Sequence, residues 1–218
     1  MSQNDQIQAL EVLQPIFPHG VFAVARGLTR DKIIPIVEAL HRGGIRAIEI
    51  TLNTPQALAM IFDLRSHFGE RMVIGAGTVR SVQEADEAYR AGAQFLVSPH
   101  TDPEIIAKAM ERNIASIPGA FTPTEIMQAW NAGARVIKLF PMRANLETYI
   151  KELKGPFHDI PFIVMGGVNA SNIKSIKSLG IFAAGIGSEL FPAHAIEKEN
   201  YDEVEQAAHT LINASVSS

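Results

Sequence analysis

The stretch "VEALHRGGIRAIEI" (residues 37–50) contains the unit from which the fold of the whole chain is predicted. An amphipathic segment ends at a pair of glycines, and a short apolar run follows them. Glycine just past a helix accepts the left-handed conformation that ends it, so this order indicates a helix that stops and a strand that begins. The same order recurs in "DEAYRAGAQFLV" (86–97), "MQAWNAGARVIKL" (127–139) and "IKSLGIFAAGI" (176–186).

Eight short apolar runs are predicted to be strands, and segments of helical length separate them. These runs are residues 21–26, 46–52, 72–78, 95–99, 115–120, 136–141, 162–167 and 182–188. Strands that alternate with helices predict right-handed parallel crossovers. Eight such units in 218 residues predict a small (β/α)₈ barrel. An open doubly wound sheet shares the alternation, but no G-x-G-x-x-G follows the first strand, so the barrel is favoured.

The composition favours one globular domain over two small ones, because 47% of the residues are hydrophobic and 19% are charged. This domain is expected to span residues 1–218, with frayed ends at about 1–8 and 212–218. The net charge of −4 includes no basic block, which argues against a nucleic-acid partner. The N-terminus has no signal-peptide pattern, and no apolar run has the length of a membrane span. We therefore expect a cytoplasmic protein without a membrane partner.

The run "ARVIKLFP" (134–141) holds a lysine among apolar neighbours, where an unpaired charge is costly. Side chains of a barrel strand alternate between the helix layer and the lumen. This alternation directs Ile137 and Leu139 to the helices, and Lys138 into the lumen with Phe140. A lysine buried in this way calls for either a partner of opposite charge or a functional role.

The run "AIEITLN" (47–53) supplies a carboxylate, because the same alternation turns Glu49, Thr51 and Asn53 inward. One interpretation is a structural ion pair with Lys138. The other is chemistry: a lysine desolvated between apolar walls becomes a nucleophilic amine that condenses with a ketone or aldehyde. Glu49, its pKa raised by burial, would then carry the proton of a departing hydroxyl, directly or through water.

The last two predicted strands run straight into helices through the glycine-rich segments "MGGVNASN" (165–172) and "GIGSEL" (185–190). In (β/α)₈ enzymes the loops after strands seven and eight commonly bind phosphate. Glycine pairs alone also serve tight turns, but their presence at both positions favours a phosphorylated ligand. The candidate phosphate-binding residues are Gly166, Gly167, Gly187 and Ser188.

Three further polar residues end or directly follow predicted strands and therefore lie at the barrel mouth. Thr78, in "GAGT", is placed to bind a substrate carboxylate, although the small residues also simply make room for neighbours. Arg26 suits a carboxylate or phosphate, although a solvated arginine is the commoner case. His100 is either an accessory acid or a residue without a catalytic role, and we favour the second interpretation. The histidines show no metal-binding spacing, and the chemistry proposed for Lys138 needs neither metal nor cofactor.

A family resemblance covers nearly the whole chain. Its motifs are "AIEITLNTPQ", "GAGTV", "VSP", "PGAFTPTE", "VIKLFP", "GGV" and "GIGSEL", in this order. They resemble those of the 2-keto-3-deoxy-6-phosphogluconate and 2-keto-3-deoxy-6-phosphogalactonate aldolases. The resemblance implies a metal-free class I aldolase, a homotrimer of (β/α)₈ barrels, that yields pyruvate and D-glyceraldehyde 3-phosphate.

The resemblance also implies roles for individual residues. Lys138 would form the Schiff base and Glu49 would be the general acid/base. Thr78 and Arg26 would bind the substrate carboxylate, and Gly167 and Ser188 would lie at the phosphate. Further substrate contacts would come from Asn53, Pro99, Phe140 and Met165.

Two departures affect which sugar acid is cleaved. Gluconate-type enzymes carry an arginine where this chain has Asn53, and a threonine where it has Met165. Arg26 is similar to an arginine of the galactonate type, so we expect relaxed specificity or a galactonate preference. Cleavage of 4-hydroxy-2-oxoglutarate is an alternative activity that the sequence leaves open. A sugar-phosphate isomerase or epimerase on the same barrel, or a binding protein without activity, are the rival hypotheses.

Overall fold

Parallel strands and helices alternate along the described part of the chain, which is residues 17, 19–141 and 146–216 of the computed structural model. The strands are β1 (Val21–Ala25), β2 (Ala47–Thr51), β3 (Val73–Gly77), β4 (Phe95–Val97), β5 (Ala115–Ile117), β6 (Gly119–Ala120), β7 (Ile137–Leu139), β8 (Phe162–Met165) and β9 (Ala183–Ile186). The α-helices are α2 (Arg30–Arg42), α3 (Ala57–Phe68), α4 (Val82–Arg90), α5 (Pro103–Glu111), α6 (Pro123–Asn131), α7 (Leu146–Lys154), α8 (Ile173–Ser178), α9 (Ala193–Glu197) and α10 (Tyr201–Val216). Two 3₁₀ turns, η1 (Gly69–Arg71) and η2 (Ser188–Leu190), complete the described elements.

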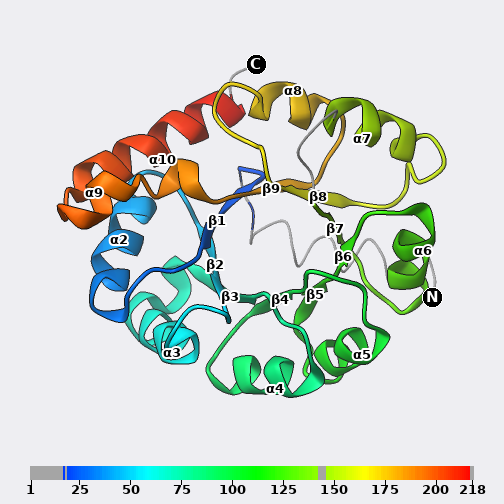
Figure 1. Cartoon of the computed structure of the whole chain (residues 1–218), viewed down its shortest axis with the longest axis horizontal. Helices are drawn as coiled ribbons and strands as arrows, with labels where there is room; N and C mark the ends of the chain where they lie inside the picture. The colour runs from blue at the N-terminus through cyan, green and yellow to red at the C-terminus, as the bar shows by residue number, and fades with distance from the viewer. Residues whose placement is uncertain (1–16, 18, 142–145, 217–218) are drawn as a thin grey trace.

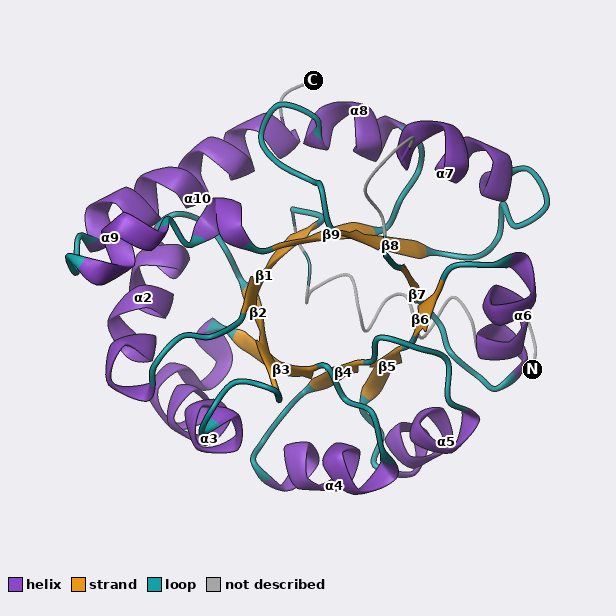
Figure 2. Ribbon diagram, viewed as in Figure 1, coloured by secondary structure: helices purple, strands orange, loops and turns teal. Residues whose placement is uncertain are grey.

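The strands form a parallel barrel inside a ring of helices (Figures 1 and 2). Their order is β5-β4-β3-β2-β1-β9-β8-β7-β6, and every pair in the sheet is parallel. β5 pairs with β4 and β6 pairs with β7, so the ring closes through the one segment that contains both strands. The predicted (β/α)₈ barrel is confirmed, and an open doubly wound sheet is excluded.

The predicted strand at 115–120 is interrupted. β5 ends at Ile117 and β6 begins at Gly119, because Pro118 between them has no N–H to contribute to a ladder. Its carbonyl still accepts a hydrogen bond from the backbone N–H of Lys138 at 2.9 Å. The segment therefore stays hydrogen-bonded to β7 across the break.

Glycines end the helices where the repeated unit predicts. Gly44 follows α2 with φ of 98°, and Gly133 follows α6 with φ of 108°. Three of the described helices, α4, α5 and α6, begin at a side-chain cap. Asp102 accepts a hydrogen bond from the N–H of Glu104, and Thr122 forms a capping box with Glu125 at the start of α6.

Apolar side chains form two layers on either side of the sheet. The outer layer, between strands and helices, includes Ile48, Ile50, Ile137 and Leu139, which confirms the predicted alternation in β2 and β7. The inner layer fills the lumen below the mouth and consists of Phe17, Phe22, Val24, Ala47, Phe95, Val97, Ile117, Val136, Ile163, Met165 and Ala183. The lumen is therefore a packed core.

The C-terminal helix corrects one prediction. The sequence predicts fraying over residues 212–218, but α10 continues to Val216. Leu211 is buried, and Lys177 Nζ donates hydrogen bonds to the carbonyls of Ser215 and His19 at 2.7 and 3.1 Å. These contacts dock the helix end. The expected frayed N-terminus, residues 1–8, lies outside the described residues, as do 217–218. None of the described helices combines the length and the apolar character needed to cross a bilayer.

Candidate active site

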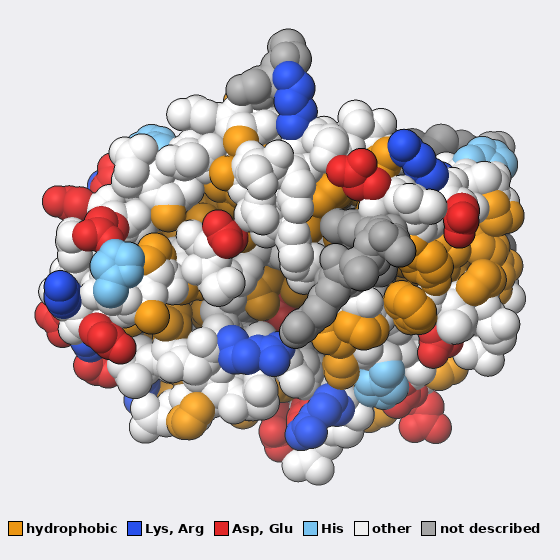
Figure 3. All heavy atoms as spheres, turned by 45° about the horizontal axis from the view of Figure 1, so that its top comes forward, with side chains coloured by type: hydrophobic (Ala, Val, Ile, Leu, Met, Phe, Trp, Pro, Cys, Tyr) orange, Lys and Arg blue, Asp and Glu red, His pale blue; other side chains and the backbone are white. Residues whose placement is uncertain are grey.

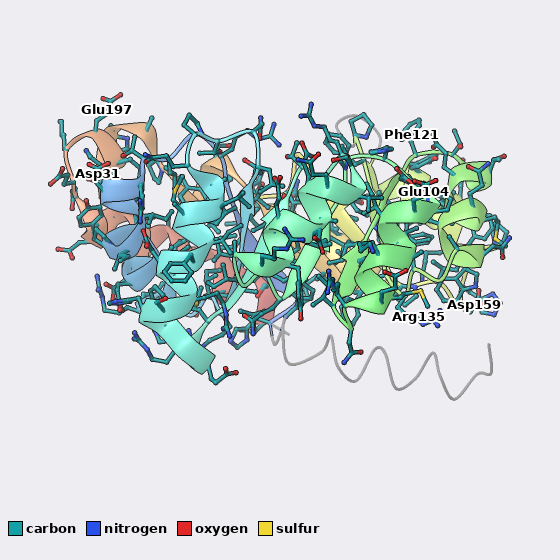
Figure 4. The ribbon with its side chains drawn as sticks, turned by 90° about the horizontal axis from the view of Figure 1, so that it is seen from below. Asp31, Glu104, Phe121, Arg135, Asp159 and Glu197 are labelled. Carbon is teal, nitrogen blue, oxygen red and sulfur yellow. The ribbon has the colours of Figure 1, made fainter. Side chains whose placement is uncertain are left out.

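The carboxyl ends of the strands meet at one end of the barrel. Figure 4 shows Asp31 and Phe121, which follow β1 and β6, at the same end as Glu197. Arg135 and Asp159, which precede β7 and β8, lie at the opposite end. The loops after the strands therefore build one mouth, which is the end where (β/α)₈ enzymes have their active sites.

A cavity of about 750 Å³ opens at this mouth, between the ends of β1, β7, β8 and β9. Eight of the residues singled out in the sequence line it together: Arg26, Lys138, Phe140, Met165, Gly166, Gly167, Gly187 and Ser188. The proposed nucleophile and the proposed phosphate-binding residues thus share one cavity.

Lys138 lines this cavity and is only 5% exposed. Its strand pairs it with Gly119 of β6 and Ile163 of β8. The ammonium lies 4.4 Å from the centre of the Phe140 ring. Burial lowers the pKa of Lys138 below its usual value; the Glu49 carboxylate opposes this shift and the Arg26 cation adds to it. The surroundings thus raise the fraction of neutral, nucleophilic amine.

Glu49 is 1% exposed and lies within the barrel beside β3. A Cβ on Gly77 would overlap its carboxyl group, so the absence of a side chain at Gly77 makes room for Glu49. Burial raises the pKa of Glu49 to about 7, against the lowering effects of Lys138 and Arg26. Its Oε2 has no hydrogen-bond partner among the described residues. A buried carboxyl that titrates near neutrality and has a free oxygen is suited to accept and donate protons.

No hydrogen bond or ion pair within 4.0 Å joins Glu49 and Lys138, although both belong to the described part of the chain. A structural ion pair needs such direct contact to offset the cost of burying two charges. The two groups affect each other's pKa across the lumen instead. The lack of direct contact disfavours a purely structural pair.

Besides Glu49 and Thr51, four residues singled out in the sequence do not line the cavity. Thr78 directly follows β3, is half-buried and has a positive φ of 58°. Asn53 is exposed beyond the end of β2. Pro99 lies after β4, where its backbone occupies the space that a side chain on Gly119 would need. His100 is exposed, with Nε2 4.0 Å from the Asp102 carboxylate.

The outer wall of the cavity contains residues that the sequence reasoning missed. Leu28, Phe191, Ala193 and Ile196 give it an apolar side, and Glu189 and Glu197 add two carboxylates. Most of them belong to η2 and α9, directly after the predicted phosphate loop. α9 has five residues, too few to show a helical period in the sequence.

Comparison with known proteins agrees with this geometry. The family model described as KDPG and KHG aldolase matches residues 17–207. The 2-dehydro-3-deoxy-6-phosphogalactonate aldolase of Escherichia coli (strain K12) is 36% identical over 174 residues, which cover 79% of this chain and 85% of that protein.

Two solved structures share the fold closely. One, described as a native KDPGal structure, is 34% identical with a TM-score of 0.82 and covers 89% of this chain and 93% of that one. The other is the KDPG aldolase of Legionella pneumophila with pyruvate captured at low pH as a covalent carbinolamine intermediate. It is 28% identical with a TM-score of 0.81 and covers 88% of this chain and 93% of that one. With a family model that matches most of its length, this chain belongs to the KDPG and KHG aldolase family.

Proposed function

We propose that the protein is a class I, metal-independent aldolase that cleaves a 2-keto-3-deoxy-6-phospho sugar acid to pyruvate and D-glyceraldehyde 3-phosphate. The observation that carries the proposal is the burial of Lys138 and Glu49 inside one barrel without direct pairing. The Escherichia coli relative is named for this reaction on the galactonate-type acid. The Legionella protein holds pyruvate as a carbinolamine, the product of an amine and a ketone.

The first step uses Lys138 as the nucleophile. Its neutral amine attacks the C2 ketone of the substrate, a C–N bond forms, and loss of water gives a protonated Schiff base. The lowered pKa of Lys138 favours this step because only the unprotonated amine attacks. The iminium then serves as an electron sink for the bond between C3 and C4.

The second step uses Glu49 as a base and then as an acid. Its carboxylate takes the proton of the C4 hydroxyl, directly or through a water, while the C3–C4 bond breaks. The electron pair of that bond forms the C2=C3 double bond, and the π electrons of the iminium move to its nitrogen, which gives an enamine. The aldehyde leaves. Glu49 then returns a proton to C3, and hydrolysis of the pyruvate Schiff base frees Lys138. A pKa of about 7 suits a group that must act in both directions.

The anionic groups of the substrate have candidate partners around the cavity. Gly166 and Gly167 adopt φ of 98° and 71°, and Asn172 Nδ2 donates a hydrogen bond of 2.7 Å to the Gly167 carbonyl. This loop, with Gly187 and Ser188, would bind the phosphate.

Arg26 would bind the substrate carboxylate, with Thr78 as a second donor. Met165 lacks the hydroxyl that the gluconate type offers the C4 oxygen. We therefore expect relaxed epimer specificity or a galactonate preference.

Homotrimer assembly remains part of the proposal. Figure 3 shows apolar side chains gathered on the side of the molecule where α6 lies. Phe121, just before α6, and Met127, within it, are 44% and 37% exposed, and the Phe121 ring stacks on Tyr149. Another copy of the chain would cover them. Light scattering on the purified protein should give three times the mass of one chain.

A substrate assay tests the reaction. The protein is incubated with each of the two C4-epimeric phosphorylated acids, with 4-hydroxy-2-oxoglutarate, and with EDTA in a parallel series. We expect pyruvate release from at least one phosphorylated acid, undiminished by EDTA. A folded protein that releases pyruvate from neither phosphorylated acid would contradict the proposal, even if it cleaves 4-hydroxy-2-oxoglutarate.

A further inference from the structure

Two buried threonines connect the end of β2 to the end of β1. Thr51 is fully buried and Thr54 is 5% exposed. Their hydroxyl oxygens lie 3.0 Å apart. Thr51 Oγ1 donates to the carbonyl of Ala25 at 3.2 Å, and the N–H of Gly27 donates to Thr54 Oγ1 at 3.0 Å. The two hydroxyls thus bridge the backbone groups immediately before and after Arg26.

The direction of these hydrogen bonds follows from the available protons. The carbonyl of Ala25 can only accept, so the Thr51 proton points to it. Thr54 must then donate to Thr51, and its own oxygen accepts from Gly27. The result is one continuous chain from the Gly27 N–H through Thr54 and Thr51 to the Ala25 carbonyl. Aligned hydrogen bonds in a buried setting strengthen one another.

The bridge acts where the sheet stops supporting β1. The last paired residues of β1 and β2 are Ala25 and Ile50, so Arg26 lies beyond the ladder. Gly27 has a φ of 71°, and a Cβ there would meet nothing within 4 Å. Among the described residues, neither ladder pairing at Arg26 nor a packing contact at Gly27 restrains this position, and Leu28 is the first residue after it that packs on the core. The threonine hydroxyls hold the backbone on both sides of Arg26.

The residue held in place by this restraint is Arg26. It lines the cavity together with Lys138, and its charge affects the titration of both Lys138 and Glu49. An arginine often binds a carboxylate or phosphate through two parallel hydrogen bonds, and this geometry depends on the orientation of the guanidinium. Free rotation of the backbone at Arg26 and Gly27 would spread the guanidinium over many positions.

We propose that the Thr51–Thr54 bridge is a positioning device that fixes Arg26 over the cavity and so sets the affinity for the anionic substrate. The proposal rests on the proposed function. Neither threonine lines the cavity, so the bridge acts through Arg26. Loss of the bridge should weaken substrate binding while the lysine chemistry continues.

The test is a set of matched variants assayed for KM, kcat and trapping of pyruvate by borohydride. Thr54→Val keeps the shape and removes the hydroxyl, and we expect a KM about 10-fold higher, with kcat within about 2-fold. Thr54→Ser restores the hydroxyl and should restore KM. Thr51→Val breaks the same chain of hydrogen bonds at its other hydroxyl and should raise KM to the same extent as Thr54→Val.

Thr101→Val is the control for the loss of a threonine hydroxyl. The Thr101 hydroxyl donates to the carbonyl of Gly119 at 3.0 Å, in β6, and has no contact with the turn at Arg26. This variant should therefore leave KM unchanged.

A double-mutant cycle separates positioning from a merely structural role. In an Arg26→Met background, Thr54→Val should change KM by less than about 2-fold, because the group that it positions is gone. The proposal is overturned if Thr54→Val changes KM equally in both backgrounds, or if Thr54→Ser does not restore KM. In either case, a pyruvate adduct on the wild type shows that the aldolase mechanism itself stands. A wild-type protein without adduct or cleavage overturns the proposed function, and the positioning role with it.

Discussion

The carboxyl group of Glu49 occupies the space that a side chain at Gly77 would need. The two residues lie on neighbouring strands, where Thr51 of β2 pairs with Gly77 of β3. Gly77→Ala should therefore displace the carboxylate and lower kcat by about 100-fold or more, the usual contribution of a general acid/base. The measurement is steady-state cleavage, with the melting temperature followed in parallel.

Gly75→Ala is the matched control for this variant. A Cβ at Gly75 would overlap the Phe95 ring in the lumen instead of the carboxylate. We expect a stability loss of about 1–3 kcal/mol from overpacking, with kcat reduced much less than by Gly77→Ala. Equal loss of kcat in the two variants would mean that general packing, and not the Glu49 position, determines activity.

The titration of Glu49 should appear in the pH dependence of stability. The folded pKa of about 7 lies above the ordinary value of 4.5, so the folded state binds the proton more tightly. The contribution of Glu49 to the free energy of unfolding is therefore fully present below pH 4.5 and is lost as pH rises from 4.5 to 7. Between these two limits the free energy of unfolding falls by on the order of 3 kcal/mol.

Urea denaturation of the wild type and of Glu49→Gln at several pH values measures this effect. Subtracting the two curves isolates Glu49 from the other titrating groups. The wild type should lose stability relative to the variant between pH 4.5 and 7, and the difference should level off above that range. A difference that is flat with pH would show that Glu49 titrates normally.

Met165 should control the choice between the C4 epimers. It lies in the lumen and in the cavity wall, where it fills space beside Gly185. Met165→Thr supplies a hydroxyl and should shift the ratio of kcat/KM toward the gluconate-type substrate by about 10-fold. The two substrates are assayed on the same preparations. An unchanged ratio would place epimer selection elsewhere, with Arg26 or Asn53 as the next residues to vary.

Lys177 should contribute to stability but not to catalysis. Its hydrogen bonds to the carbonyls of His19 and Ser215 join α8, the entry to β1 and the end of α10. Lys177→Met keeps the stem and removes both bonds, so we expect a loss of about 1–3 kcal/mol in unfolding free energy, with kcat unchanged. Lys198→Met, at an exposed lysine after α9, is the control and should change neither.

The sequence predicts the barrel because the repeated helix–glycine–strand unit depends on local chemistry. Alternation within one strand also predicts that Lys138 faces away from the helix layer that holds Ile137 and Leu139. These features need no knowledge of distant contacts. The split of the fifth strand at Pro118 was missed, although the missing proline donor was a visible signal.

Other features of the site depend on contacts between distant segments. The space that Gly77 leaves for Glu49, and the bridge from Thr54 to Gly27, follow from the register of neighbouring strands. Ordinary strand alternation does not specify that register. The outer wall from Phe191 to Glu197 escaped prediction because its helix is too short to show a period.

The most direct test of the account is the mass of the protein after incubation with pyruvate and sodium borohydride, with peptide mapping of the product. Only an imine is trapped by this reduction. We predict that the wild type gains one reduced pyruvate on the peptide containing Lys138 and that Lys138→Ala gains none. A folded wild-type protein that gains no adduct, or an adduct that persists in Lys138→Ala, would contradict the assignment of Lys138 as the Schiff-base nucleophile.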